Sequence, residues 1–154
     1  MSDKGVMVFI EQNDGAIADV SLELLCKARE LAGGLGAPVE AVLLGHEMDD
    51  KLDTLGHYGC ETVYYVADER LAHFTSVPYA KTVAAQILKH EPQIVLFGAT
   101  ITGRDMAPRV ASELKCGLTA DCTDLQIGEH TINDKTYEKT LLQIRPALGG
   151  NSIA

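Results

Sequence analysis

Short apolar runs alternate with amphipathic stretches from the start of the chain to Leu114, and this alternation limits the possible folds more than any other feature. Runs such as Val6–Ile10 and Ile94–Phe97 are apolar at every position, which is typical of a parallel strand buried on both faces. The stretches between the runs have helical spacing and crossover length. Repeated βαβ units therefore predict an α/β fold, with a mainly parallel sheet between helices on both faces.

The expected elements follow from apolar spacing and from turn residues. Strands are expected at 6–10, 38–44, 62–66 and 94–97, and helices at 19–35, 49–58, 78–91 and 105–114. Asp19 is a good cap for the first helix, and Asp105 is the expected N-cap of the last, which puts Pro108 in its first turn. The polar segment 68–76 is expected to be a loop.

The pattern changes after Leu114. Two expected strands, at 123–127 and 137–144, flank a polar turn with no helix between them, so they should pair antiparallel and add an antiparallel edge to the sheet. Residues 145–154 form a Pro/Gly-rich loop that begins another strand. No linker or composition shift divides the chain, so residues 1–154 are expected to form a single α/β domain.

Composition excludes several classes of protein. A net charge of −9 and a pI near 4.9 argue against nucleic-acid binding, which depends on a basic surface. No apolar run approaches the ~20 residues of a membrane span, and no signal peptide precedes the first strand. We therefore expect a protein without membrane insertion, cytoplasmic if bacterial or in the matrix if organellar. The four cysteines lack metal-binding spacing and are expected to be buried thiols (Cys26, Cys60, Cys116 and Cys122).

The motifs of self-sufficient enzymes are missing. The turn after the first strand, Glu11–Gly15, matches neither dinucleotide nor P-loop signatures, and its acid would repel phosphate. There is no G-x-S-x-G elbow and no histidine pair with metal spacing. We therefore expect no independent catalytic centre.

Three stretches could contact a ligand, and for one of them, Gly117–Asp121, Gly and Thr turn chemistry explains most of the pattern. Gly98, Thr100, Gly103 and Arg104 form the turn between an apolar strand and a helix, where backbone donors favour anions, although Gly and Thr also suit a purely structural turn. Arg145 precedes Pro146 and a Gly-Gly pair, so its guanidinium could reach a ligand or partner chain, or form a surface salt bridge.

Three motifs in order resemble the N-terminal domain of the electron transfer flavoprotein α subunit. They are G-A-T-I-T-G-R-D-M-A-P-R-V-A-S-E-L at 98–114, G-L-T-A-D-C-T-D-L at 117–125 and R-P-A-L-G-G-N at 145–151. The opening V-F-I-E-Q and the D-V-S-L-E-L-L helix at 19–25 extend the resemblance over essentially the whole chain. It implies a three-layer, Rossmann-like fold of the adenine-nucleotide α-hydrolase-like kind.

The resemblance also implies partners and a cofactor. Such α subunits pair with a β subunit and carry electrons from flavin dehydrogenases, for example of the acyl-CoA type, to a quinone reductase. Bifurcating versions exchange electrons with ferredoxin and NADH. FAD is held mainly by the C-terminal domain of α, which this chain is expected to lack, and by the β subunit. In bifurcating members the arginine matching Arg145 reaches the flavin of the β subunit, which makes Arg145 the expected cofactor contact.

Two other functions stay open at this stage. One is a small ATP/AMP-binding module of the stress-protein-like α/β superfamily, with the turn from Gly98 to Arg104 as phosphate cradle. The other is a freestanding acyl- or amide-transfer enzyme of the same superfamily, for which the sequence shows no nucleophile.

Overall fold

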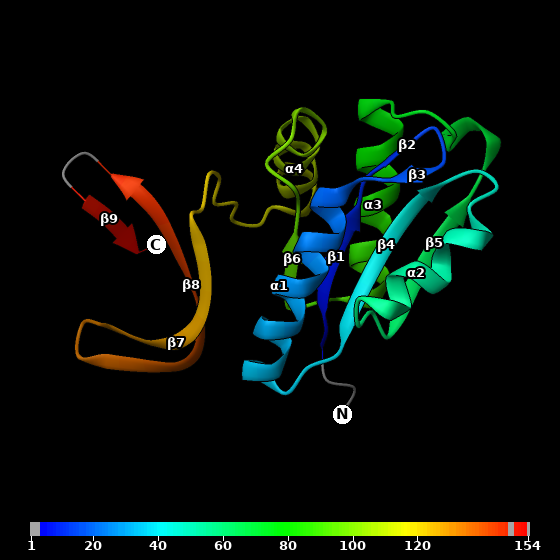
Figure 1. Ribbon diagram of the computed structural model, residues 1–154. Coiled ribbons are helices and arrows are strands. Elements are labelled where there is room, and N and C mark those ends of the chain that lie inside the picture. The colour runs from blue at the N-terminus through cyan, green and yellow to red at the C-terminus, as the bar shows by residue number, and fades with distance from the viewer. Residues whose placement is uncertain (1–3, 148–149, 154) are drawn as a thin grey trace.

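The computed structural model describes the backbone of residues 4–147 and 150–153 and the side chains of residues 4–144. Four parallel strands form its main sheet in the order β5-β4-β1-β6, as Figure 1 shows. Their bounds are Val6–Ile10 for β1, Val39–Gly45 for β4, Thr62–Ala67 for β5 and Ile94–Leu96 for β6. The expected parallel strands are thus confirmed.

Helices cover both faces of this sheet. Helices α1 (Asp19–Leu35) and α2 (Leu52–His57) pack on one face, and α3 (Ser76–His90) and α4 (Ile101–Leu114) pack on the other. Short 3-10 turns precede α2 and α3, namely η1 (Asp49–Lys51) and η2 (Glu69–Leu71). The segment 68–76 is therefore not a plain loop, because η2 interrupts it.

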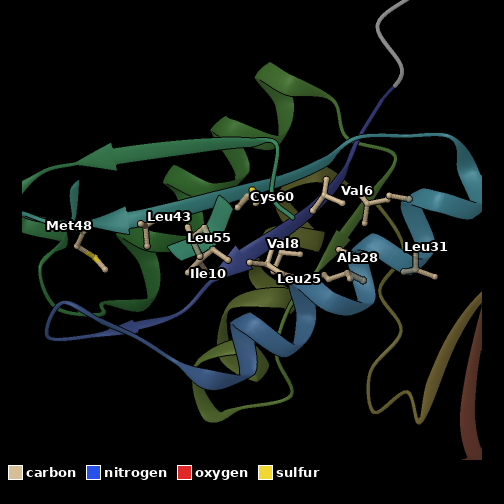
Figure 2. Close-up of a cluster of buried hydrophobic side chains, with 14 residues drawn as sticks. Val6, Val8, Ile10, Leu25, Ala28, Leu31, Leu43, Met48, Leu55 and Cys60 are labelled. Atoms are coloured by element: carbon tan, nitrogen blue, oxygen red, sulfur yellow. The ribbon is translucent and has the colours of Figure 1, made fainter. Parts of the chain in front are cut away.

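The central strand β1 is buried on both sides. Val6, Val8 and Ile10 face α1, as Figure 2 shows, whereas Met7 and Phe9 face α3 and α4. None of these five side chains is more than 1% exposed. Each contributes about 1.5–3 kcal/mol through removal of apolar surface from water, which explains why this strand is apolar without alternation.

Helix α4 begins earlier than the sequence pattern suggested. Its N-cap is Thr100, whose side chain accepts a hydrogen bond from the Gly103 amide, so the prediction of Asp105 as N-cap is wrong. Pro108 lies inside the helix and cannot donate to the carbonyl of the residue one turn earlier. The helix pattern in the sequence begins only at Met106, because the first apolar residue that α4 buries is Met106. Ile101, the first helical residue, is apolar but 93% exposed, so it does not belong to the buried face.

The C-terminal strands form a separate sheet. Strands β7 (Asp124–Ile132), β8 (Lys135–Ala147) and β9 (Gly150–Ile153) pair antiparallel in the order β7-β8-β9, which confirms the expected antiparallel pair. The pair does not extend the parallel sheet, however, and that part of the prediction is wrong. It packs instead against α1, where Ile127 lies over Gly34, and Figure 1 shows it beside α1 and β6.

A small hairpin follows β1. Strands β2 (Gln12–Asn13) and β3 (Ala16–Ile17) enclose an Asp-Gly turn with positive φ at both residues, which suits a tight hairpin. Of the cysteines, Cys60 is buried, whereas Cys26 and Cys116 are exposed, so the expectation of buried thiols is wrong for these two. Cys26 is an exposed residue of α1, and Cys116 follows the end of α4.

Candidate functional site

The chain changes direction across the sheet between β1 and β6. From β1 it adds β4 and β5 on one side and then crosses back to place β6 on the other side of β1. In open α/β sheets the crevice beyond the carboxyl ends of two such strands is the usual ligand site. Glu11 follows β1 here, and the turn from Gly98 to Thr100 follows β6.

The Glu11 carboxylate occupies this crevice. The Thr100 hydroxyl donates to Glu11 Oε1 at 2.6 Å and accepts from the Gly103 amide at 3.0 Å. Glu11 is only 7% exposed, and its own amide donates to the Ser21 hydroxyl oxygen at 2.7 Å. A negative charge is favourable at the N-terminus of α4, so this internal carboxylate takes the position that a ligand anion would need.

The two glycines of the turn permit this close packing. A Cβ atom on Gly103 would lie 1.8 Å from the carbonyl oxygen of Gly98, and one on Gly98 would lie 2.9 Å from Glu11 Oε1. The predicted site residues Gly98, Thr100 and Gly103 are therefore brought together. Thr100 contacts Glu11 and Gly103, while Gly98 and Gly103 also line the cavity described below. Their contact with a ligand stays a prediction.

Arg104 points to a different segment. Its Nη2 lies 2.8 Å from Asp121 Oδ1, and its Nε donates to the Ala99 carbonyl at 3.3 Å. Because both ionic side chains are 63% exposed, this pair contributes little to stability. It does connect α4 to the small-residue segment 117–121, which begins the second motif of the sequence.

A cavity of about 650 Å³ lies beside this ion pair, between α4, α1 and the segment 117–125. Its walls are mainly apolar, with the Lys27–Asp124 and Arg104–Asp121 pairs among the lining residues. The buried Oε1 of Gln143, which also lines the cavity, has no hydrogen-bond partner among the described residues. The volume is within the range of small-molecule sites, but both lining cations are already paired with carboxylates.

The Lys27–Asp124 pair is a contact that the sequence reasoning missed. Lys27 Nζ lies 2.9 Å from Asp124 Oδ1 and 3.1 Å from Glu30 Oε2. Burial opposes the charge on Lys27, but these hydrogen bonds outweigh it and raise its pKa. Nothing in the local spacing of Lys27 indicates a partner 97 positions away.

Arg145 lies in β8, where its backbone pairs with Ser152. Its side chain lies outside the described residues, so its role as a flavin contact stays a prediction. Within residues 4–144, no group of three or more His, Cys, Asp or Glu side chains could hold a metal ion. The described helices include none that is long and apolar enough to span a membrane.

The charge at the crevice disfavours the pyrophosphate of a flavin dinucleotide. A pyrophosphate at the N-terminus of α4 would meet the buried Glu11 carboxylate, and like charges at close range repel. The sequence already pointed this way through the acid at position 11. The partners of Glu11 could not be foreseen, because Thr100 is 89 positions away and Ser21 reads as part of an amphipathic helix.

Comparison with known proteins identifies the family. The electron transfer flavoprotein domain matches residues 6–154. The electron transfer flavoprotein subunit alpha of Thermoanaerobacterium thermosaccharolyticum is 42% identical over 98% of this chain, and that of Clostridium acetobutylicum is 45% identical over 98%. The lactate dehydrogenase (NAD(+),ferredoxin) subunit LctC of Acetobacterium woodii is 43% identical over the same share.

These relatives are longer than the matched region. The chain covers 43% of each of the two α subunits and 34% of LctC. The family match extends from β1 to the last residue, and it includes all three motifs on which the resemblance was based. The chain therefore belongs to the electron transfer flavoprotein domain family and corresponds to the N-terminal domain of the α subunit.

Proposed function

We propose that this chain is a packing domain of an electron transfer flavoprotein α subunit. It docks on a β subunit and so helps to carry electrons between flavin dehydrogenases and a quinone reductase, or ferredoxin and NADH in a bifurcating complex. The observation that carries the proposal is the identity of 42–45% to α subunits along 98% of the chain. The name of the LctC relative, which includes ferredoxin, favours the bifurcating version.

The crevice supports a packing role over nucleotide binding. The buried Glu11 carboxylate, which is bonded to Thr100, would repel a phosphate at the N-terminus of α4. Under this proposal FAD is bound mainly by the C-terminal part of the α subunit and by the β subunit. The role of this domain is then to hold the α and β subunits in a fixed relative position in the cytoplasm, without catalysis of its own.

Arg145 is the residue that we propose to contact the flavin of the β subunit. A guanidinium beside the N1/C2 carbonyl edge of the bound isoalloxazine favours its anionic reduced states and so raises its potential. The Arg145→Gln variant should lower that potential in the complex and leave complex formation intact. The matched control is Arg109→Gln, which removes an arginine that pairs on the surface with Asp105.

The test of the proposal is assembly. The chain is mixed with the β subunit of its own electron transfer flavoprotein, and the mixture is separated by size-exclusion chromatography with detection of visible flavin absorbance. Co-elution of this chain with the β subunit and flavin is the expected result. Separate elution at micromolar concentrations of both proteins would count against a docking role.

A further inference from the structure

Helix α3 is a basic element on an acidic molecule. Its residues Ser76–His90 include Lys81, Lys89 and His90 but no aspartate or glutamate, whereas the chain as a whole has a net charge of −9. His90 stacks on Tyr64, with ring centroids 3.5 Å apart. Lys81 and Lys89 are exposed, and among the described side chains no carboxylate lies within 4 Å of either ammonium group.

The outward side of α3 is apolar around these lysines. Val77 is 51% exposed and Leu88 is 66% exposed, although each is a large apolar side chain. Lys81 and Ala85 lie between them at spacings of three or four residues, which puts all four on one side of the helix. We call this exposed side, with Lys89 beside it, the α3 stripe. The opposite side of α3 is buried against the sheet (Tyr79, Ala80, Val83 and Ala84).

The α3 stripe has the layout of a surface on which a second helix docks. Val77 and Leu88 are about three turns apart, roughly 16 Å along the helix axis. Ala85 is small and exposed between them, so the backbone of a second helix can approach closely there. A helix face that only meets water carries mainly polar side chains, with apolar ones scattered singly.

The neighbouring helix α4 adds little charge beside the stripe. Helices α3 and α4 lie side by side on the same face of the sheet, as Figure 1 shows. On α4, Arg109 pairs with Asp105 at 3.3 Å, and the exposed Glu113 is balanced by the exposed Lys115 just beyond the helix. A partner that contacts the stripe therefore meets mainly the two lysines of α3.

We propose that the α3 stripe binds an acidic amphipathic helix of a partner protein. The apolar residues of such a helix recur every three or four positions, so they meet Val77 and Leu88 along one line. Carboxylates on either side of that line would pair with Lys81 and Lys89, which are about two turns apart. Charge complementarity identifies the chemistry of the partner, because the described side chains offer these lysines no carboxylate.

Two other occupants fit the stripe less well. A second copy docked through the same face would set Lys81 and Lys89 against their own equivalents, since a two-fold interface pairs a surface with itself. An anionic membrane would attract the two lysines but repel a molecule with a net charge of −9. A single helix is less affected by that net charge, because physiological salt screens charges more than about 8 Å away.

This inference goes beyond the proposed docking on a β subunit and does not rest on it. The probe is a fluorescently labelled, helix-forming synthetic peptide of about 18 residues, with leucine along one face and glutamate on both sides of it. Fluorescence anisotropy follows its binding to the 154-residue chain. The expected Kd is below about 200 µM at low salt and rises at least about fivefold in roughly 0.5 M salt.

Charge reversal tests the lysines of the stripe. The double variant Lys81→Glu, Lys89→Glu should bind the peptide at least about tenfold more weakly. The matched control is Lys135→Glu, Lys139→Glu, which reverses two exposed lysines of β8 and changes the net charge of the chain equally. The control should bind as the unmodified chain does. Equal losses in both double variants would show that net charge alone matters and would overturn the assigned surface.

A second pair of variants tests the apolar part of the stripe. Leu88→Asp should weaken peptide binding at least about fivefold, whereas Ile132→Asp, at a residue of β7 that is 51% exposed, should leave it unchanged. In nuclear magnetic resonance spectra, the amide signals of Ala85 and Leu88 should shift as the peptide is added. No saturable binding up to about 1 mM peptide, or shifts confined to other elements, would overturn the proposal.

Two further arms identify the occupant. Vesicles of phosphatidylcholine and phosphatidylserine should not bind the chain, and vesicle binding that is lost in Lys81→Glu, Lys89→Glu would assign the stripe to a membrane instead. The peptide titration is then repeated on the complex of the chain with its β subunit, where binding should persist. Loss of binding in that complex would show that the β subunit covers the stripe and would overturn a separate partner.

Discussion

At the residue scale, the contact between Glu11 and Thr100 determines the charge at the carboxyl edge of the sheet, where an anionic ligand would otherwise bind. The sequence predicted a ligand contact for the turn residues, beside a purely structural alternative, because Gly and Thr at a strand-to-helix junction suit both an anion site and a tight turn. The ligand contact stays a prediction. Local patterns do not indicate which distant side chain fills such a site. The sequence did show an acid directly after the first strand. Its place beside the turn from Gly98 to Thr100 follows only from the strand order, which puts β1 next to β6.

Gly103→Ala should destabilise the protein, whereas Gly33→Ala should stabilise it. The new methyl group at position 103 would lie 1.8 Å from a backbone carbonyl, and overpacking of this kind costs about 1–3 kcal/mol or more. At Gly33, inside α1, an added Cβ meets nothing within 4 Å, and Ala gains about 0.5–1 kcal/mol of helix propensity. Urea unfolding of both variants measures the difference, and equal signs would contradict the packing argument.

Thr100→Val should lower the free energy of unfolding by about 1–3 kcal/mol. The valine has a similar shape but removes the N-cap of α4 and leaves the buried Glu11 carboxylate without the hydroxyl that donates to it. Thr100→Ser keeps the hydroxyl and is the control, with an expected change within about 0.5 kcal/mol. If chemical denaturation finds the two variants equally stable, the hydroxyl does not support this turn.

Cys60 should resist thiol reagents while Cys26 and Cys116 react. Burial raises the pKa of the Cys60 thiol to about 11, so the reactive thiolate is scarce at pH values near 8. The other two cysteines are exposed. Alkylation at pH about 8, followed by peptide mass spectrometry, should modify Cys60 only after denaturant is added. Modification of Cys60 in the folded protein at the rate of Cys26 would contradict its burial.

At the scale of elements, the sequence predicted existence and type better than boundaries or neighbours. Apolar runs located β1, β4 and β6, and β-branched and aromatic residues located β5, whose side chains are partly buried or exposed. The start of α4 was placed about one turn too late. Its first residue, Ile101, is exposed, so the spacing of buried apolar residues does not include the first turn. Alternation also predicted β7 and β8, but a local pattern does not specify whether an antiparallel pair joins an existing sheet or packs on a helix.

Acid should loosen the contact between the second sheet and α1. Hydrogen bonds from Gln126, Lys27 and the Leu125 amide lower the pKa of Asp124 to about 2, from an ordinary value of 3.8. The folded state therefore binds this proton less readily than the unfolded chain. Its stabilising contribution is present above about pH 4 and is lost as the pH falls towards about 2.

Pepsin, which is active in acid, measures this loosening. Cleavage within β7 and β8 should rise as the pH falls through this range, and Asp124→Asn should show the faster cleavage already at pH 4 or so. Glu30→Gln, which removes the other carboxylate beside Lys27, is the control and should behave as the unmodified protein. A cleavage rate that is the same for all three proteins would contradict the anchoring role of Asp124.

At the scale of the whole molecule, charge and shape both disfavour nucleotide binding. The chain has a net charge of −9, and the buried carboxylate of Glu11 lies at the carboxyl edge of its sheet, bonded to Thr100. Isothermal titration of the isolated chain with ATP and AMP should therefore give no binding tighter than about 1 mM. Micromolar affinity for either nucleotide would instead favour the small ATP/AMP-binding module as the function.

The central position of β1 also has a consequence for biosynthesis. Strand β1, which is translated before both of its neighbours, pairs with Val39–Leu43 on one side and with Ile94–Leu96 on the other. Its second neighbour is thus translated long after its first, and the intervening chain must close a large loop before the sheet is complete. Until then the most apolar strand of the domain keeps one edge open, so the period between translation of β4 and of β6 is when the nascent chain most needs protection from aggregation.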